Sequence, residues 1–339
     1  MVSLKDISAA CGVSVATVSK ALNGHKDVGQ ETRERIRKVA MELGYMPNAA
    51  AKALKTNRSY NLGILFVDES QSGLTHDYYA ALLDSFKKEA ELQGYDLTFI
   101  NSNSQRQNRM SYLAHSRYRG FDGVCIACVN FYDPEIMELV RSDIPIVTID
   151  HVFNNRMVIQ SDNVQGMTDL LNYIIGKGHR RIAFIHGTDS AVTQNRLSAF
   201  YKTCYENGIT EIPEEYVQEA PYRDMNKTAK LTEYLLDLPV RPTCILYPDD
   251  YAAFGGINAI RERGLSIPDD ISIAGYDGVR ISQQIRPNLT TLAQDTKTMG
   301  KEAADKLIRL IEQPRTTLVE TVLVPGHLLT GSTVKDITG

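Results

Sequence analysis

Seven polar or aromatic side chains lie at or near the ends of predicted strands, the edge at which α/β sheets bind small molecules. They are Tyr78, Tyr79, Asp150, Arg196, Asp249, Asp277 and Gln294. A carboxylate accepts hydrogen bonds from two adjacent hydroxyls, and a guanidinium donates in a fixed fork. A tyrosine ring can cover the apolar C–H face of a pyranose. These side chains therefore predict a site for a neutral sugar.

Other ligands fit this set of side chains less well. Three aspartates and one arginine leave the predicted site negative, so the dianion of a sugar phosphate would be repelled. A purine would need more stacking surface and fewer carboxylates, although a nucleoside remains an alternative. The aspartates also have a structural explanation, because aspartate is a common helix N-cap. Asp249 and Asp250 directly precede a predicted helix, so either interpretation fits them.

Alternating strands and helices, which begin at residue 61, must position these side chains. Strands are predicted over residues 62–67, 96–100, 123–127, 145–149, 181–185, 243–247 and 271–275. Amphipathic helices lie between them, for example over Tyr78–Gln93 and Asn163–Gly176. Near-continuous apolar strands that alternate with helices indicate parallel sheets covered on both faces. The segment 61–339 is long for one sheet, so we expect two lobes.

The first 60 residues follow a different pattern. Short helices are predicted over residues 4–11, 15–23 and 31–43, and Ser14 is the expected N-cap of the second. A tight turn between the first two of three short helices is typical of a helix-turn-helix unit, although a generic three-helix bundle has the same pattern.

Charge separates this head from the rest of the chain. Residues 1–60 contain ten Lys and Arg and five Asp and Glu, a net charge of +5. The remaining residues carry 27 basic and 36 acidic side chains, a net charge of −9. A basic head on an acidic body predicts a polyanionic partner for the head alone.

Several classes of protein are disfavoured. No apolar run reaches the roughly 18 residues that a membrane span needs, and the N-terminus lacks the features of a signal peptide. The five cysteines are scattered; Cys125 and Cys128 fall in a predicted strand, on opposite faces, and are expected to be buried and structural. The cysteine pattern favours a cytoplasmic location. No phosphate-binding glycine motif and no metal-type histidine spacing are present, so we expect no cofactor and no metal. His179 is interpreted as a surface residue before a strand.

The head closely resembles the DNA-binding head of the lactose/galactose repressor (LacI/GalR) family. The matching pieces, in the family's order, are Gly12-Val13-Ser14, Thr17-Val18-Ser19, Leu22-Asn23-Gly24, Thr32-Arg33 and Tyr45-x-Pro47-Asn48. The resemblance extends almost to the C-terminus. It implies an all-α helix-turn-helix head and an α/β, two-lobed core like that of periplasmic binding proteins, with parallel sheets. The implied domains are a DNA-binding domain over 1–47, a hinge helix and linker over 48–60, and an effector-binding and dimerisation domain over 61–339. The chain is expected to cross between lobes near residues 160–162, 291–294 and 320–325.

The resemblance also implies roles for residues of the head. The second helix would enter the major groove, where Val15 and Ala16 can touch only thymine methyl groups and Lys20 can donate to guanine. Lys20 stands where the family often has Arg or His. Phosphate contacts are implied for Thr17, Ser19, Asn23 and Thr32.

In the hinge, Asn48 would begin a short helix, and Leu54, with Lys55 nearby, would insert into the minor groove and kink the duplex. In the body, the seven side chains named above correspond to effector-contacting positions of the family. Asp249 departs from the Asn or Ser frequent there, and the segment 72–76 departs from the family's usual loop.

The function implied is that of a non-enzymatic transcription regulator, expected to be a repressor. It would bind a pseudo-palindromic operator as a homodimer, and a small sugar-type effector between the lobes would control its DNA affinity. The C-terminus has no leucine heptad, which favours a dimer over a tetramer. A glycosidase with paired cleft carboxylates is one rival, but it leaves the DNA-binding head unexplained. A second rival is an architectural DNA-binding protein, which would respond to no small molecule.

Overall fold

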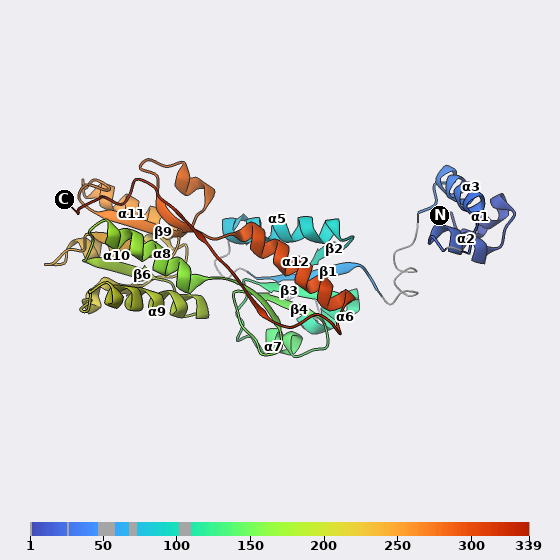
Figure 1. Ribbon diagram of the computed structural model, residues 1–339, viewed down its shortest axis with the longest axis horizontal. Coiled ribbons are helices and arrows are strands. Elements are labelled where there is room, and N and C mark those ends of the chain that lie inside the picture. Colours follow the sequence, from blue (N-terminus) through green and yellow to red (C-terminus); the bar gives the residue numbers. More distant parts are fainter. Residues whose placement is uncertain (1, 26, 47–57, 68–72, 102–109, 339) are drawn as a thin grey trace. The chain divides into compact units, whose positions relative to one another are not determined.

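The computed structural model describes residues 2–25, 27–46, 58–67, 73–101 and 110–338. It divides into two compact units, Met1–Ser59 and Tyr60–Gly339 (Figure 1). The predicted hinge residues Asn48, Leu54 and Lys55 lie outside the described residues.

The described residues of the first unit form three helices, α1 (Leu4–Cys11), α2 (Val15–Leu22) and α3 (Gln30–Glu42). Their apolar faces meet in one core formed by Ile7, Cys11, Val18, Ala21, Val28, Ile36 and Ala40. Gly12 ends α1 with φ = 62°, a left-handed conformation that favours glycine. Ser14 then caps α2, because its Oγ accepts a 3.1 Å hydrogen bond from the Thr17 amide. The predicted cap is confirmed, and the predicted helices agree with these bounds to within one residue.

The second unit contains two six-stranded sheets. Sheet A has the order β11-β5-β4-β3-β1-β2, and sheet B has the order β12-β10-β9-β8-β6-β7. The strands are β1 (Asn61–Phe66), β2 (Asp96–Phe99), β3 (Gly123–Ala127), β4 (Ile146–Ile149), β5 (Met157–Ser161), β6 (Ile182–His186), β7 (Val217–Glu219), β8 (Cys244–Leu246), β9 (Ser272–Asp277), β10 (Thr290–Ala293), β11 (Thr321–Val324) and β12 (His327–Leu329). Neighbouring strands are parallel, apart from the antiparallel pair β10 and β12.

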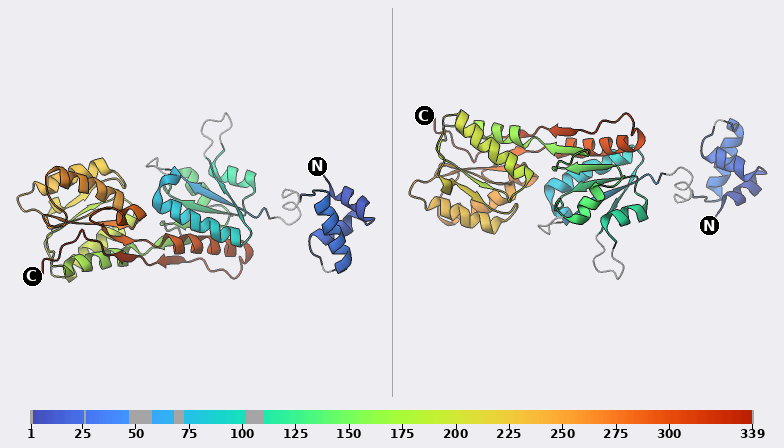
Figure 2. Two further views of the ribbon diagram at one scale, coloured as in Figure 1. Left: turned by 90° about the horizontal axis from the view of Figure 1, so that it is seen from above. Right: turned by 90° about the horizontal axis from the view of Figure 1, so that it is seen from below.

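Helices cover both faces of each sheet (Figures 1 and 2). They are α5 (Asp77–Leu92), α6 (Tyr112–Arg119), α7 (Pro134–Val140), α8 (Asn163–Gly176), α9 (Ala191–Glu206), α10 (Met225–Leu236), α11 (Asp250–Glu262) and α12 (Thr296–Glu312), with the 3-10 turns η1 (Gly73–Thr75), η2 (Glu214–Tyr216) and η3 (Arg280–Gln283). Sheet A packs against α5 and α12 on one face and against α6 and α7 on the other. Sheet B packs against α8 and α9 on one face and against α10 and α11 on the other.

The chain passes between the two lobes three times, as predicted. It leaves sheet A after β5 at Asp162, returns from sheet B after β10 through residues 294–295, and leaves sheet A again after β11 through residues 325–326. The predicted crossings near 160–162 and 291–294 overlap the last residues of β5 and β10, and that near 320–325 overlaps β11, because short strands lead into these connections.

Two interpretations of single residues were wrong. His179 is only 1% exposed, because the C-terminal segment folds over it: its Nε2 lies 3.1 Å from the Lys335 carbonyl and its Nδ1 lies 2.9 Å from Thr243 Oγ1. Cys128 follows the end of β3 with φ = 51° and is half-buried, so only Cys125 of the pair lies within the strand core. Within the described ranges, no helix is long and apolar enough to cross a membrane, and no group of His, Cys, Asp and Glu could hold a metal ion.

Candidate functional site

Two of the predicted aspartates have unusual backbone conformations at the carboxyl ends of their strands. Asp150 directly follows β4 with φ = 57°, and Asp277 ends β9 with φ = 98°. Residues other than glycine rarely adopt positive φ, and where they do the surrounding structure must enforce it. Such strain is concentrated at functional sites, so both positions are candidates for ligand contact.

Asp150 is held by groups from two elements of the first lobe. The Tyr78 hydroxyl donates to Asp150 Oδ2 at 2.7 Å, and the Ser161 amide donates to Oδ1 at 3.2 Å. Burial raises the pKa of Asp150, and burial together with this carboxylate raises the pKa of Tyr78 well above its ordinary value. Tyr78 is only 6% exposed and lies within the core between α5 and sheet A. Its role is therefore to orient Asp150, and the neighbouring Tyr79, which is half-buried, is the more accessible ring.

Arg196, from α9 of the second lobe, is held in place by three groups. Its Nε donates to Asn163 Oδ1 at 2.8 Å and its Nη1 donates to the Pro248 carbonyl at 2.9 Å. The guanidinium stacks on the Tyr276 ring, 3.5 Å from its centroid. Burial lowers the pKa of Arg196, but neighbouring tyrosines and aspartates raise it above the ordinary value, so the group stays charged.

Asp277 and Gln294 form a pair at the second crossing. Gln294 Nε2 donates to Asp277 Oδ1 at 2.6 Å, and the Gln294 amide donates to the Asp277 carbonyl at 3.2 Å. Burial raises the pKa of Asp277, and the nearby Arg196 opposes this rise. The charges that act on Asp277 also include Asp249, and those that act on Asp150 include Arg196 and Asp277. The structure thus brings predicted residues from both lobes to one place.

Asp249 and Asp250 have mainly structural contacts. Asp249 is the N-cap of α11: its Oδ1 accepts from the Ala252 amide at 2.9 Å, and its Oδ2 accepts from the Arg223 amide at 2.7 Å. Asp250 is fully buried and accepts from Thr291 Oγ1 at 2.6 Å and from the Val279 amide at 2.8 Å. The N-cap alternative for Asp249 is confirmed, and the charge of Asp249 also acts on Asp277.

Several residues of this site were missed in the sequence. Tyr276 carries the stack with Arg196, and its position directly before Asp277 at the end of a predicted strand was a usable signal. Tyr222, whose hydroxyl lies 2.8 Å from Thr193 Oγ1, and Arg223 follow β7. That strand has only three residues, too few to show an apolar pattern.

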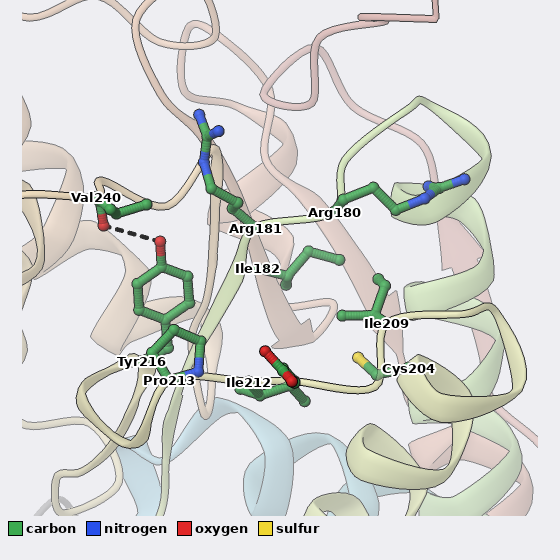
Figure 3. Close-up of a pocket in the computed structure, with 10 residues that line it drawn as sticks. Arg180, Arg181, Ile182, Cys204, Ile209, Ile212, Pro213, Tyr216 and Val240 are labelled. Atoms are coloured by element: carbon green, nitrogen blue, oxygen red, sulfur yellow. Dashed lines mark hydrogen bonds between the residues drawn. The ribbon is translucent and has the colours of Figure 1, made fainter.

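The more enclosed of two cavities lies away from these residues. A cavity of about 150 Å³ is lined by Arg180, Arg181, Ile182, Cys204, Ile209, Glu211, Ile212, Pro213, Tyr216 and Val240 (Figure 3). It lies at the amino end of β6, whereas the predicted effector residues lie at the carboxyl ends of strands. A second, more open cavity of about 860 Å³ runs along α5 and β2. Neither cavity contains the charged cluster.

In the head, α2 presents the predicted base-reading side chains to solvent. Val18 and Ala21 are buried on one face, and Val15, Ala16 and Lys20 are exposed on the other. Lys20 forms an ion pair with Asp27. Of the predicted phosphate contacts, Thr17, Ser19 and Thr32 are half-buried and Asn23 is exposed. Asn23 Nδ2 also donates to the Ser19 carbonyl at 2.7 Å, which stabilises the end of α2.

These features define a regulator that joins a helix-turn-helix head to a two-lobed binding core. A family model for bacterial regulatory proteins of the lacI family matches residues 3–48, and one for a periplasmic binding protein-like domain matches residues 171–334. The chain is 30% identical to the probable HTH-type transcriptional repressor ExuR of Bacillus subtilis (strain 168), over 100% of both chains. It therefore belongs to the LacI family of transcription repressors, which confirms the predicted family and fold class and a role as a regulator and not an enzyme.

Solved structures agree with this assignment. The lac repressor dimer bound to operator and the anti-inducer ONPF is similar over 98% of this chain and 99% of that chain, with 25% identity and a TM-score of 0.80. A complex of the transcriptional regulator CelR with cellobiose shares the fold over 98% of this chain and 100% of that chain, with 23% identity and a TM-score of 0.70.

Proposed function

We propose that this regulator is a homodimeric, cytoplasmic repressor that binds a pseudo-palindromic operator and releases or tightens it when a neutral sugar binds between its lobes. The proposed domains are residues 1–47 for base and phosphate contacts, 48–60 for the hinge, and 61–339 for effector binding and dimerisation. The observation that carries the proposal is the cluster of Asp150, Arg196 and Asp277: the charges of Arg196 and Asp277 act on Asp150, and the charge of Arg196 acts on Asp277.

The chemistry of the cluster favours hydroxyl groups as ligands. Asp150 and Asp277 supply half-buried acceptors, and Arg196 supplies donors that stacking on Tyr276 holds in a plane. Tyr79 and Tyr222, both half-buried, provide aromatic surface nearby. Asp249, Tyr78 and Gln294 complete the proposed set, Tyr78 and Gln294 by orienting the carboxylates of Asp150 and Asp277. The excess of carboxylates over cations disfavours a phosphate.

Operator recognition is proposed for the exposed face of α2. Lys20 would donate to guanine, Val15 and Ala16 would touch thymine methyl groups, and Thr17, Ser19, Asn23 and Thr32 would contact phosphates. Asn48, Leu54 and Lys55 of the hinge would act at the minor groove. The net charge of +5 over residues 1–60 supports this assignment, since DNA binding by such a head depends on release of counterions.

The proposed dimer uses the face along α5 and β2. β2 is an edge strand of sheet A, and the cavity of about 860 Å³ along it is lined by the exposed side chains Leu74 (58% exposed) and Phe99 (42% exposed). Leu92, at the end of α5, is 82% exposed. Apolar side chains of this size beside an open strand edge favour a protein partner, and a second copy gives the two-fold symmetry of a palindromic site.

A thermal-shift screen tests the effector assignment. Neutral sugars, sugar phosphates and nucleosides are added to the full chain, and a neutral sugar is expected to raise the melting temperature by mass action. Arg196→Ala and Asp277→Ala should abolish that shift while operator binding persists. Arg180→Ala, which alters the cavity at the amino end of β6, is the control and should respond like wild type. A larger shift with a sugar phosphate or nucleoside, or a normal response of Asp277→Ala, would contradict the assignment.

A further inference from the structure

Three side chains form a bridge from one lobe to the other. Asp77 begins α5, which packs on sheet A, whereas Arg223 follows β7 and Tyr251 lies in α11, both of the second lobe. The Tyr251 hydroxyl donates to Asp77 Oδ2 at 2.5 Å, and Arg223 Nη1 lies 3.7 Å from the same oxygen. The Arg223 guanidinium also stacks on the Tyr251 ring, 4.0 Å from its centroid. The Asp77 carboxylate therefore contacts both the Arg223 guanidinium and the Tyr251 hydroxyl, and the side chains of Arg223 and Tyr251 also contact each other.

The second-lobe side of the bridge is preorganised. Arg223 has φ = 63°, and its amide donates to Asp249 Oδ2 at 2.7 Å. The other oxygen of Asp249 caps α11, the helix that carries Tyr251. Asp249 thus fixes the backbone on both sides of the stack, and the Arg223 side chain is only 15% exposed. A side chain held in this way loses little further freedom when it meets its partner.

The bridge adjoins the proposed effector site on both sides. Asp77 directly precedes Tyr78, which holds Asp150, and Asp249 is one of the groups whose charge acts on Asp277. A change in the distance between the lobes must break the contacts of Asp77. The same change alters the separation of Asp150 from Arg196 and Asp277, because Asp150 belongs to the first lobe and the other two belong to the second.

We propose that Asp77 is a positioning residue that, through Arg223 and Tyr251, sets the separation of the two lobes and hence the geometry of the effector site. The inference deepens the proposed function and rests on its placement of an effector between the lobes. The Asp77 contacts described above are with Tyr251 and Arg223, neither of which is assigned to direct sugar contact. Asp77 therefore acts through the spacing of the lobes. A ligand that needs another spacing must break the bridge, and one that needs this spacing is helped by it.

A double-mutant cycle on the full chain, without added sugar or DNA, tests the bridge. Asp77→Asn removes the charge but keeps the shape, and Tyr251→Phe removes the hydroxyl but keeps the ring under Arg223. Hydrogen exchange is followed in two segments, residues 77–83 and 249–255. Each single variant is expected to raise exchange in both segments by about two- to five-fold, the range for a partly exposed ion pair. The double variant should add little, because either change already breaks the bridge.

Asp84→Asn is the matched control, since Asp84 lies in the same helix and pairs with Lys88 one turn away, at 2.6 Å. It should leave the segment 249–255 unchanged. The inference is overturned if the effects of the two bridge variants add, or if each variant raises exchange only in its own segment. The measurement uses no ligand, so it can succeed or fail independently of the thermal-shift screen. If the thermal-shift screen identifies a sugar, Asp77→Asn should also change the affinity of the protein for that sugar, and Asp84→Asn should not.

Discussion

Lys20 Nζ lies 2.5 Å from Asp27 Oδ2, so the side chain proposed to read a base is paired with an acid from the turn between α2 and α3. Both side chains are about half exposed, at 51% and 53%. The hydrogen bond from Lys20 lowers the pKa of Asp27, which therefore stays ionised at neutral pH. Exposed pairs of this kind contribute little to stability, so DNA can displace the acid from the lysine. The acid nevertheless adds a negative charge close to the proposed DNA face.

Asp27→Asn is expected to strengthen operator binding by a few-fold at low salt, because it frees Lys20 and removes repulsion of phosphates. The gain should shrink as salt rises, since exposed charges are screened. Titration of a labelled operator duplex at several salt concentrations measures both effects. Glu42→Gln, which removes the same charge at the far end of α3, should give a smaller gain. Equal gains from the two variants would show a general charge effect and no special role for Asp27.

Lys20→Ala should weaken preference at one base step by about 1–3 kcal/mol, provided that Lys20 donates to guanine. Binding to a set of duplexes that differ at single positions measures the preference. Equal weakening on every duplex would instead identify Lys20 as a phosphate contact. Lys38→Ala, which removes one positive charge from an exposed position on α3, serves as the control and should leave the preference unchanged.

Gly300→Ala should destabilise the core. A Cβ at Gly300 would lie 2.2 Å from the Leu82 carbonyl oxygen and 2.8 Å from the Phe86 nitrogen, both backbone atoms of α5. The two helices must then move apart, at a cost of about 1–3 kcal/mol. Gly176→Ala, at the end of α8, meets no atom within 4 Å and should be neutral or slightly stabilising. Denaturant unfolding of both variants gives the comparison; similar stability of the two would be evidence against close packing of α5 and α12.

His179 should make the stability of the core depend on pH. Burial lowers the pKa of His179 from the ordinary value of 6.5, so the unfolded chain binds the proton more readily than the folded chain. The stability contributed by the neutral His179 ring is fully present above pH 6.5. It is lost as the pH falls below 6.5 and then through the lower pKa of the folded chain. His179→Gln should thus reduce the drop in melting temperature between about pH 8 and about pH 5. His327→Gln, at an exposed position, should leave the drop unchanged.

The sequence was sufficient for elements with a long apolar pattern. The predicted segment 123–127 and the helix 163–176 agree with β3 and α8, because β3 is a continuous buried run and the buried side chains of α8 repeat at helical spacing. β5, a strand of five residues, was not predicted. Nor were β7, β10, β11 and β12. They are three or four residues long, and β11 and β12 lie at sheet edges where exposed side chains leave no alternation to detect.

The positions of Asp150 and Asp277 in the candidate site could be predicted from the sequence, but the contacts among the side chains of the site could not. Asp150 and Asp277 follow apolar strands, so their place at the carboxyl edge could be inferred from order along the chain. That Tyr78 is buried behind Asp150, or that Arg223 reaches Asp77, depends on packing between segments more than 70 residues apart. No local pattern carries such information. The same holds for His179, which the distant Lys335 covers.

The three crossings have a consequence for how the chain is made. A ribosome releases β1 to β5 first, yet the helix that completes one face of sheet A, α12, and its edge strand β11 come from residues 296–324. β12, the edge strand of sheet B, follows two residues later. The nascent chain must therefore carry an uncovered apolar face of sheet A while the whole of the second lobe is being synthesised. Both lobes close only after α12, β11 and β12 have been made, so the unfinished protein is exposed to aggregation and to chaperones until then.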